Sequence, residues 1–359
     1  MKKMMRWLGA ILVMISGLAA VVPAQAANTN TSNNIGFSVA AQTPKNQIDK
    51  QATFFDLKMT AGQTQTLQTR IYNTTNRDIR VAMGIHTAYT NSGGAIEYVT
   101  PAKKYDASLQ YRVDQLTKIK GPTTVTVPAN GSKLVSAQTT MPTKDFNGAL
   151  LGGWYFKRVD QKVTGEVKGA TNISSEYSYV VGIKYSLGTA PTPVLKLSDV
   201  AAGMVNYHRS IVVTLRNTAA VMIPRVTMKT TVTAKDSGKT VVKATKQGVM
   251  VAPNTTFNYP LLLNKQKLQA GTYHLHLVAH NSAHKWTFDR DFKISAATAK
   301  TYNQDTVDDN GISIWWLIGL GALGMLIVVL LILWLVLFLK KRRQSQDYQQ
   351  SARCLVWDC

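Results

Sequence analysis

The sequence predicts an all-β protein of two immunoglobulin-like β-sandwich domains followed by a single C-terminal transmembrane helix. Between residues 35 and 294, short runs alternate apolar residues with Thr, Lys and Gln, the period-two pattern of half-buried strands. Gly, Pro, Asn and Asp separate these runs at spacings typical of a sandwich. An uncharged run of 28 residues, 312–339, follows the last of them.

The first 26 residues read as a removable signal peptide. Three basic residues precede an apolar run, Leu8–Ala20, and the Ala-x-Ala site Ala24–Ala26 follows it. The apolar run is too short to span a bilayer comfortably. We therefore expect the mature chain to be exported.

The exported part divides into two domains. The first sandwich is expected at 35–158 and the second at 177–295. Between them, 159–176 is polar and poor in large apolar residues, so it is either a linker or a long hairpin tip.

A repeated phrase indicates that the two domains share one plan. "RIYNTTNRDIRVAM" begins at Arg70 and "LRNTAAVMIPRVTM" begins at Leu215. Three landmarks recur in the same order: an Asn-Thr turn, a Pro-Asn turn and a Gly that leads a strand. They are Asn73 and Asn217, "VPANGS" at Val127 and "VAPNTT" at Val251, and Gly148 and Gly271. Turn chemistry common to all sandwiches could produce part of this likeness.

The first domain is longer between its first two landmarks, which places an insertion within Tyr89–Lys120. Long excursions from a sandwich often carry recognition, and tyrosine offers a flat apolar ring with a polar tip. The candidate binding residues are Tyr89, Tyr98, Lys103, Lys104, Tyr105 and Tyr111. The alternative is that these tyrosines pack the insertion onto its own domain.

Residues 296–311 are polar and are expected to form a juxtamembrane stalk. The run 312–339 is long enough, at ~42 Å as a helix, to cross a ~30 Å hydrocarbon core. Trp315 and Trp316 stand at its outer end, where indole rings favour the interface. Four basic residues end the run and mark 340–359 as a cytoplasmic tail: Lys340, Lys341, Arg342 and Arg343.

The chain is strongly basic, with 41 Lys and Arg against 19 Asp and Glu. The signal peptide and the tail hold eight of these basic residues and two of the acidic ones, so 27–311 keeps a net charge of +16. Such a surplus attracts polyanions, among which anionic wall polymers and the lipid surface fit this location better than nucleic acid. The alternative is that the charge serves solubility alone.

The sequence offers little catalytic chemistry. No G-x-S-x-G motif, P-loop or convincing acid pair occurs, so we expect no enzyme and no cofactor. Four histidines lie close together, at 274, 276, 280 and 284, but exposed strand positions explain them better than a metal does. Both cysteines, Cys354 and Cys359, fall in the tail, so the exported part must fold without a disulfide.

Specific phrases resemble a known family. "YSYVVGIKYSL", "VMVAPNTTFNYPL" and "LQAGTYHLHLVAHNSAHKWTFDRDFKI" resemble the C-terminal extracellular domain of WxL-interacting proteins, which are surface proteins of Gram-positive bacteria. The region from "IGFSVAAQTPKNQ" through "LGGWYFKR" is similar to the N-terminal domain of that family. The closing "SARCLVWDC" matches no family feature.

The resemblance implies a binding role. It assigns peptidoglycan binding to the first domain and host-surface binding to the second, and it implies that the protein holds WxL-domain proteins at the wall. The expected location is the cell membrane, single-pass, with the two domains facing the wall. The expected partners are peptidoglycan or an anionic wall polymer, WxL-domain proteins, a host matrix protein and the bilayer. The alternatives are a direct adhesin for host matrix or a wall-modifying hydrolase.

Overall fold

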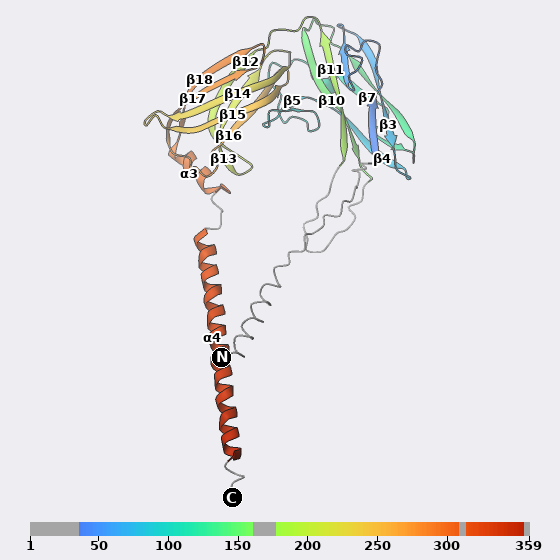
Figure 1. Ribbon diagram of the computed structural model, residues 1–359. Coiled ribbons are helices and arrows are strands. Elements are labelled where there is room, and N and C mark those ends of the chain that lie inside the picture. The colour runs from blue at the N-terminus through green and yellow to red at the C-terminus, as the bar shows by residue number, and fades with distance from the viewer. Residues whose placement is uncertain (1–35, 161–176, 309–313, 355–359) are drawn as a thin grey trace.

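The computed structural model describes residues 36–160, 177–308 and 314–354. It contains two β-sandwiches and a long C-terminal helix, α4 (Ile314–Cys354), which confirms the predicted fold class. Figure 1 shows the two sandwiches side by side, with α4 extending away from the second. The predicted signal peptide lies outside the described residues.

A four-stranded and a five-stranded sheet form the first sandwich. In spatial order the first sheet is β1 (Phe37–Ala41), β3 (Thr64–Asn73), β9 (Ser132–Thr140) and β7 (Thr117–Lys120). The second is β2 (Phe55–Lys58), β11 (Ser178–Leu187), β10 (Gly148–Arg158), β4 (Ile79–Thr87) and β8 (Thr124–Val127). The insertion adds a hairpin, β5 (Tyr89–Thr90) with β6 (Ile96–Glu97), and a short helix, α2 (Val113–Leu116).

The core of this sandwich follows the period-two pattern of its strands. On β10, Trp154 and Phe156 are fully buried and stack with their ring centroids 5.3 Å apart. Tyr155 between them points to the other face and is half-buried. Burial of these large rings supplies much of the hydrophobic stabilisation in a domain that has no disulfide.

Strand β11 does not lie where the sequence analysis put it. It was assigned to the second domain, at 177–295, but it pairs with β10 along its length and with β2. The first sandwich therefore extends to Leu187. Because β10 and β11 are antiparallel neighbours, the polar segment 159–176 connects two strands of one sheet and is not an interdomain linker. Its residues 161–176 lie outside the described part of the chain.

Residues 188–194 form the covalent connection between the sandwiches, and they include Pro191 and Pro193. The second sandwich has a sheet of β12 (Leu195–Val205), β13 (His208–Asn217) and β16 (Thr255–Leu262). Its other sheet is β15 (Thr240–Val251), β14 (Ile223–Ala234), β17 (Gly271–His280) and β18 (Lys285–Ile294).

Two buried asparagines explain the repeated phrase. Asn73 ends β3, and its side-chain amide donates to the carbonyls of Arg77 at 2.8 Å and Pro128 at 2.9 Å. Asn217 ends β13, and its amide donates to the carbonyls of Val221 at 2.7 Å and Ala252 at 2.9 Å. Each asparagine thus bridges its own turn, four residues on, to the Pro-Asn turn. The two domains use the same device at the same place.

The predicted stalk is not an extended segment: its described residues, 296–308, are folded. Residues 296–304 form helix α3 (Ala296–Gln304), and Ser295 caps it by accepting a hydrogen bond from Thr298 N at 3.0 Å. Beyond α3, Asp308 accepts from His208 Nδ1 at 2.6 Å and from Arg209 N at 3.0 Å. The polar composition reflects these hydrogen bonds, so 296–308 belongs to the end of the second sandwich.

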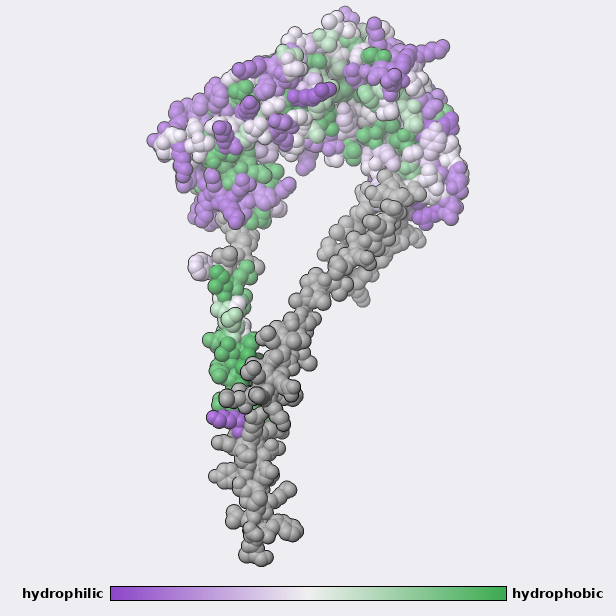
Figure 2. Space-filling model, viewed as in Figure 1, coloured by the Kyte–Doolittle hydropathy of each residue, from purple (hydrophilic) through white to green (hydrophobic). Residues whose placement is uncertain are grey.

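Helix α4 contains the predicted membrane span. Within the described residues, Trp315–Lys340 is the one stretch long and apolar enough to cross a bilayer, with a mean hydropathy of 3.2. Its side chains are exposed along this stretch, and Figure 2 shows them as a hydrophobic rod. The helix continues through the basic residues to Cys354, beyond which 355–359 are not described.

Candidate functional site

The insertion of the first domain is fastened at its base by three side chains. It leaves β4 at Thr87, whose buried hydroxyl hydrogen-bonds to the carboxylate of Asp114 in the first turn of α2. Arg112 reaches the same carboxylate through Nε at 3.1 Å. Although burial alone would raise the pKa of Asp114, the hydrogen bonds from Arg112 and Thr87 hold it below its usual value. These contacts hold the start of the insertion, at Thr87, against its last part, at Arg112 and Asp114.

The six candidate residues of the insertion do not form one cluster. Tyr111 packs edge-on against Phe146 at 5.8 Å, beside the core of the first sandwich. The ring of Tyr105 lies under the guanidinium of Arg112 at 4.5 Å. All four tyrosines are half-buried, whereas the two lysines are exposed. The tyrosines are Tyr89, Tyr98, Tyr105 and Tyr111, and the lysines are Lys103 and Lys104.

Tyr98 differs because it lies over the outer face of the five-stranded sheet. A methyl group placed on Gly153 would come within 3.0 Å of its Cβ, so the glycine is what lets Tyr98 approach the strand. The backbone carbonyl of Tyr98 also lies 3.2 Å from Nδ1 of His86 on β4. Tyr98 is thus fixed to this face from both its backbone and its side chain.

A flat aromatic surface continues from Tyr98 across the sheet. The rings of His86 and Tyr155 stack at 5.5 Å with an interplanar angle of 26°. Tyr155 is paired with Gly84 across β4 and β10, and Gly153 is paired with His86. We call the surface formed by Gly84, His86, Tyr98, Gly153 and Tyr155 the aromatic face. The ring of His86 lies beside Gly84, and Val180 and Tyr98 lie over Gly153, so neighbouring side chains fill the space at both glycines.

Sequence reasoning found only one member of the aromatic face, Tyr98. The missed signal was the glycine pattern, because glycine inside a strand often marks a close approach by another backbone or a ligand. Gly84, Gly153 and Gly182 all point outward, and Gly153 is paired with Gly182 across β10 and β11. Their alignment depends on strand register, which the sequence does not show.

The insertion also joins the two domains. The N–H of Thr90 donates to Thr255 Oγ1 at 3.1 Å, and its hydroxyl accepts from Ala252 N at 2.8 Å. The carbonyl of Gly94 accepts from Met250 N at 2.8 Å. We call this set, together with the Asp106 contacts below, the clasp. It engages the Pro-Asn turn of the second domain.

Asp106 is the charged centre of the clasp. Arg216 on β13 donates to its two oxygens at 2.7 and 2.8 Å, and Thr256 donates to one of them. The Asp106 carboxylate is nearly inaccessible, whereas the Arg216 side chain is 33% exposed. Burial alone would raise the pKa of Asp106, but the hydrogen bonds from Arg216, Thr256 and Ser108 lower it far below its usual range.

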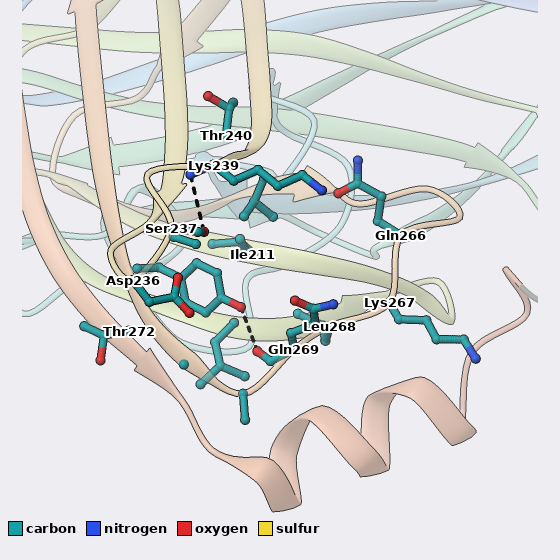
Figure 3. Close-up of a pocket in the computed structure, with 16 residues that line it drawn as sticks. Ile211, Asp236, Ser237, Lys239, Thr240, Gln266, Lys267, Leu268, Gln269 and Thr272 are labelled. Atoms are coloured by element: carbon teal, nitrogen blue, oxygen red, sulfur yellow. Dashed lines mark hydrogen bonds between the residues drawn. The ribbon is translucent and has the colours of Figure 1, made fainter.

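The second sandwich carries a cavity of about 370 Å³ at the end that bears α3. It lies between the β14–β15 turn and the segment before β17, as Figure 3 shows. Ile211, Leu268 and Tyr273 give it an apolar floor, and Tyr273 donates to the carbonyl of Gln269 at 2.8 Å. Lys239 and Lys267 stand at its rim. Sequence reasoning did not single out this cavity.

Two of the three histidines on β17, His274 and His276, contact carboxylates. His274 Nδ1 lies 2.7 Å from Asp291, and His276 Nδ1 lies 2.7 Å from Asp289. Because His274 donates hydrogen bonds to the carboxylates of Asp291 and Asp289, its pKa is raised. Within the described ranges, no three His, Cys, Asp or Glu side chains are arranged to hold a metal ion.

Two family models match the chain and together cover more than half of it. Residues 37–158 match the model described as WxL Interacting Protein, peptidoglycan binding domain. Residues 168–304 match WxL Interacting Protein, host binding domain. The second match begins before β11, so it includes a strand that the fold places in the first sandwich. A search of curated proteins found no match.

The chain is also similar to solved structures, at low identity. One comes from "Chaperone-tip adhesin complex is vital for synergistic activation of CFA/I fimbriae biogenesis", at 14% identity and a TM-score of 0.30, covering 73% of this chain and 100% of that one. Another is the YadV chaperone, at 11% identity and a TM-score of 0.28, covering 72% and 100%. A third is a PapD-like domain of human CEP192, at 10% and 0.23, covering 44% and 88%.

Proposed function

Because the chain belongs to the WxL Interacting Protein family, we propose that it is a membrane-anchored adaptor that binds peptidoglycan with its first domain and holds WxL-domain proteins at the cell wall. The two matched domains support a cell-surface protein that binds peptidoglycan. The adaptor role, the binding residues and the orientation are our proposals. We orient both sandwiches outward and the basic end of α4 toward the cytoplasm, following the positive-inside rule.

The aromatic face is the observation that carries the proposed site. Pyranose rings of the glycan strands have an apolar C–H face, which stacks on flat aromatic rings. Tyr155 offers such a ring, and His86 fixes its orientation by stacking on it at 5.5 Å. Both rings are half-buried, so part of each stays open to a sugar, whereas Val180 and Tyr98 cover Gly153. Tyr98 borders this face, with Lys103 and Lys104 farther along the same insertion.

Sedimentation with purified sacculi tests this site. Full-length protein in detergent should co-sediment with sacculi from which anionic polymers have been removed. Tyr155→Ala should lower the affinity about tenfold, the equivalent of ~1.4 kcal/mol, because it removes one stacking ring. The matched control is Tyr72→Ala, which removes a tyrosine that is 39% exposed on β3 of the other sheet and should not change binding.

The two variants distinguish loss of the binding site from loss of the fold, and the salt dependence distinguishes stacking from attraction by net charge. Equal losses for both variants, or a lower melting temperature for Tyr155→Ala, would count against the aromatic face. Binding should persist at physiological salt, because stacking is insensitive to screening. Binding that disappears there would reduce the interaction to the net charge of the exported region.

The adaptor role requires a second measurement. A purified WxL-domain protein should bind the full-length protein in detergent, and Tyr155→Ala should leave that interaction intact. If the protein binds host matrix and no WxL-domain protein, direct adhesion replaces the adaptor role. Release of soluble wall fragments from the sacculi would instead indicate a hydrolase.

A further inference from the structure

The end of the second sandwich nearest α4 is tied to the membrane helix by a short connection. Asp308 is the last described residue before α4, and five residues separate it from Ile314. Six Cα–Cα steps span at most ~20 Å when fully extended. The apolar stretch begins at Trp315, so Asp308 cannot lie far from the membrane interface.

Hydrogen bonds fix Asp308 to the tip of the β12–β13 hairpin. The carbonyl of Tyr207 accepts from Val307 N and from the hydroxyl of Thr306, each at 3.1 Å. Asp308 in turn contacts His208 at 2.6 Å and the buried Arg209 at 3.4 Å. The hairpin tip therefore stays with the chain that enters the membrane.

Tyr207 at this tip has two unusual properties. Its side chain is 70% exposed, which is the largest exposure of any bulky apolar side chain on the described sandwiches. Its backbone adopts φ 63, directly after Asn206 at φ 50. Two consecutive residues of this kind form the turn that favours Asn-Gly, so a tyrosine in the second position costs about 1 kcal/mol relative to glycine. The turn thus holds an exposed ring at a position that disfavours it.

Other exposed apolar and basic side chains lie at the same end of the sandwich as Tyr207. Val307 and Leu262 are 44% and 45% exposed, and Leu262 is paired with Ser210 at the start of β13. Three exposed lysines lie on the segment after β16 and on α3, against one exposed carboxylate there, Asp305. The lysines are Lys265, Lys267 and Lys300.

We propose that this tip surface docks onto the outer leaflet of the membrane that α4 spans. It is defined as Tyr207, Leu262, Val307, Lys265, Lys267 and Lys300. A tyrosine suits the headgroup region because its ring is apolar and its hydroxyl is polar. The lysines lie where phosphate groups of anionic lipids can meet them. The short connection supplies a high effective concentration, so a small surface is sufficient for docking.

A fluorescent reporter in the full-length protein tests the docking. In a Cys354→Ser, Cys359→Ser background, Val307→Cys carries an environment-sensitive dye in nanodiscs of phosphatidylglycerol with a headgroup-level quencher. The matched reporter is Ser282→Cys in the β17–β18 turn, at the opposite end of the same sandwich. We expect quenching several-fold stronger at 307 than at 282.

The connection alone would bring residue 307 near the membrane, so the deciding variant is Tyr207→Asn. Asparagine tolerates the turn conformation, so the fold should be retained and the melting temperature should not fall. Docking predicts that quenching at 307 drops several-fold in Tyr207→Asn and is kept in Tyr207→Trp. Unchanged quenching in Tyr207→Asn would overturn the proposal.

A second experiment varies the charge of the lipid. Replacing the three lysines by glutamine should weaken quenching in phosphatidylglycerol and have a smaller effect in phosphatidylcholine. An equal effect in both lipids would overturn the role of the lysines in recognising an anionic surface.

Discussion

The carboxylate of Asp106 and the guanidinium of Arg216 form a two-pronged ion pair between the domains, with N–O distances of 2.7 and 2.8 Å. Asp106 comes from the insertion of the first domain, and Arg216 comes from a strand of the second. A residue range expected to carry recognition therefore also fastens the domains together. The two roles are compatible, because the aromatic face lies on the sheet and the clasp faces the neighbouring domain.

Breaking this pair should uncouple the domains. In a double-mutant cycle of Asp106→Asn and Arg216→Gln, we expect a coupling energy of about 2 kcal/mol in chemical denaturation. A fully buried pair would give more, but Arg216 remains one-third exposed and solvent screens part of the interaction. Lys235→Gln is the control, because it removes a pair with Asp291 in which both side chains are about half exposed. A cycle without coupling would contradict the clasp.

The same pair predicts how stability depends on pH. The pKa of Asp106 is depressed in the folded protein, so its ionised form stabilises the fold above the unfolded pKa of ~3.9, and this contribution is lost as pH falls below that value. The unfolding free energy of the parent should therefore fall more steeply below pH ~4 than that of Asp106→Asn. Denaturation curves at a series of acidic pH values measure this, and parallel slopes would refute it.

The buried asparagines should be costly to remove. Asn73→Ala and Asn217→Ala should each lower the unfolding free energy by about 3 kcal/mol, because each leaves buried carbonyls without their donor. Asn76→Ala, in the exposed turn beside Asn73, should change it by less than ~0.5 kcal/mol. Similar costs for Asn73→Ala and Asn76→Ala would show that the bridge contributes little.

Gly148 should be needed where the sandwiches touch. A Cβ there would lie 2.3 Å from the carbonyl oxygen of Ala220, and the residue has φ 130. Gly148→Ala should therefore lower the melting temperature and weaken the junction. Gly238→Ala is the matched control, because Gly238 also has positive φ, at 67, but has open space around it. Only the backbone strain of about 1 kcal/mol applies at Gly238, so equal effects would exclude a steric role.

Local pattern was enough to predict most strands and their turn landmarks. The alternation on β13 and the turn residues Asn73, Asn217 and Gly148 depend on neighbouring residues, which a sequence shows directly. The predicted insertion, 89–120, contains β5, β6 and α2, but its last four residues form β7 of the four-stranded sheet.

The pairing of strands that are distant in the sequence could not be predicted from the local pattern of residues. "YSYVVGIKYSL" was correctly predicted to be a strand, but its place in the first sandwich depends on pairing with β2 and β10. Helix α3 has one buried residue, Ala299, so it shows no apolar stripe from which to predict it. The aromatic face needs Gly84, His86 and Tyr155 to be in register across strands.

The connection Gly188–Val194 has a mechanical consequence. Under the proposed function, any displacement of the wall away from the membrane puts this connection under tension. Between the sandwiches the covalent segment with Pro191 and Pro193 runs parallel to the hydrogen bonds of the clasp and to the bond from Ala149 N to the carbonyl of Ala220. Because these hydrogen bonds and the covalent segment join the same two domains, the hydrogen bonds must break before the Pro-rich segment can extend fully and carry the load alone.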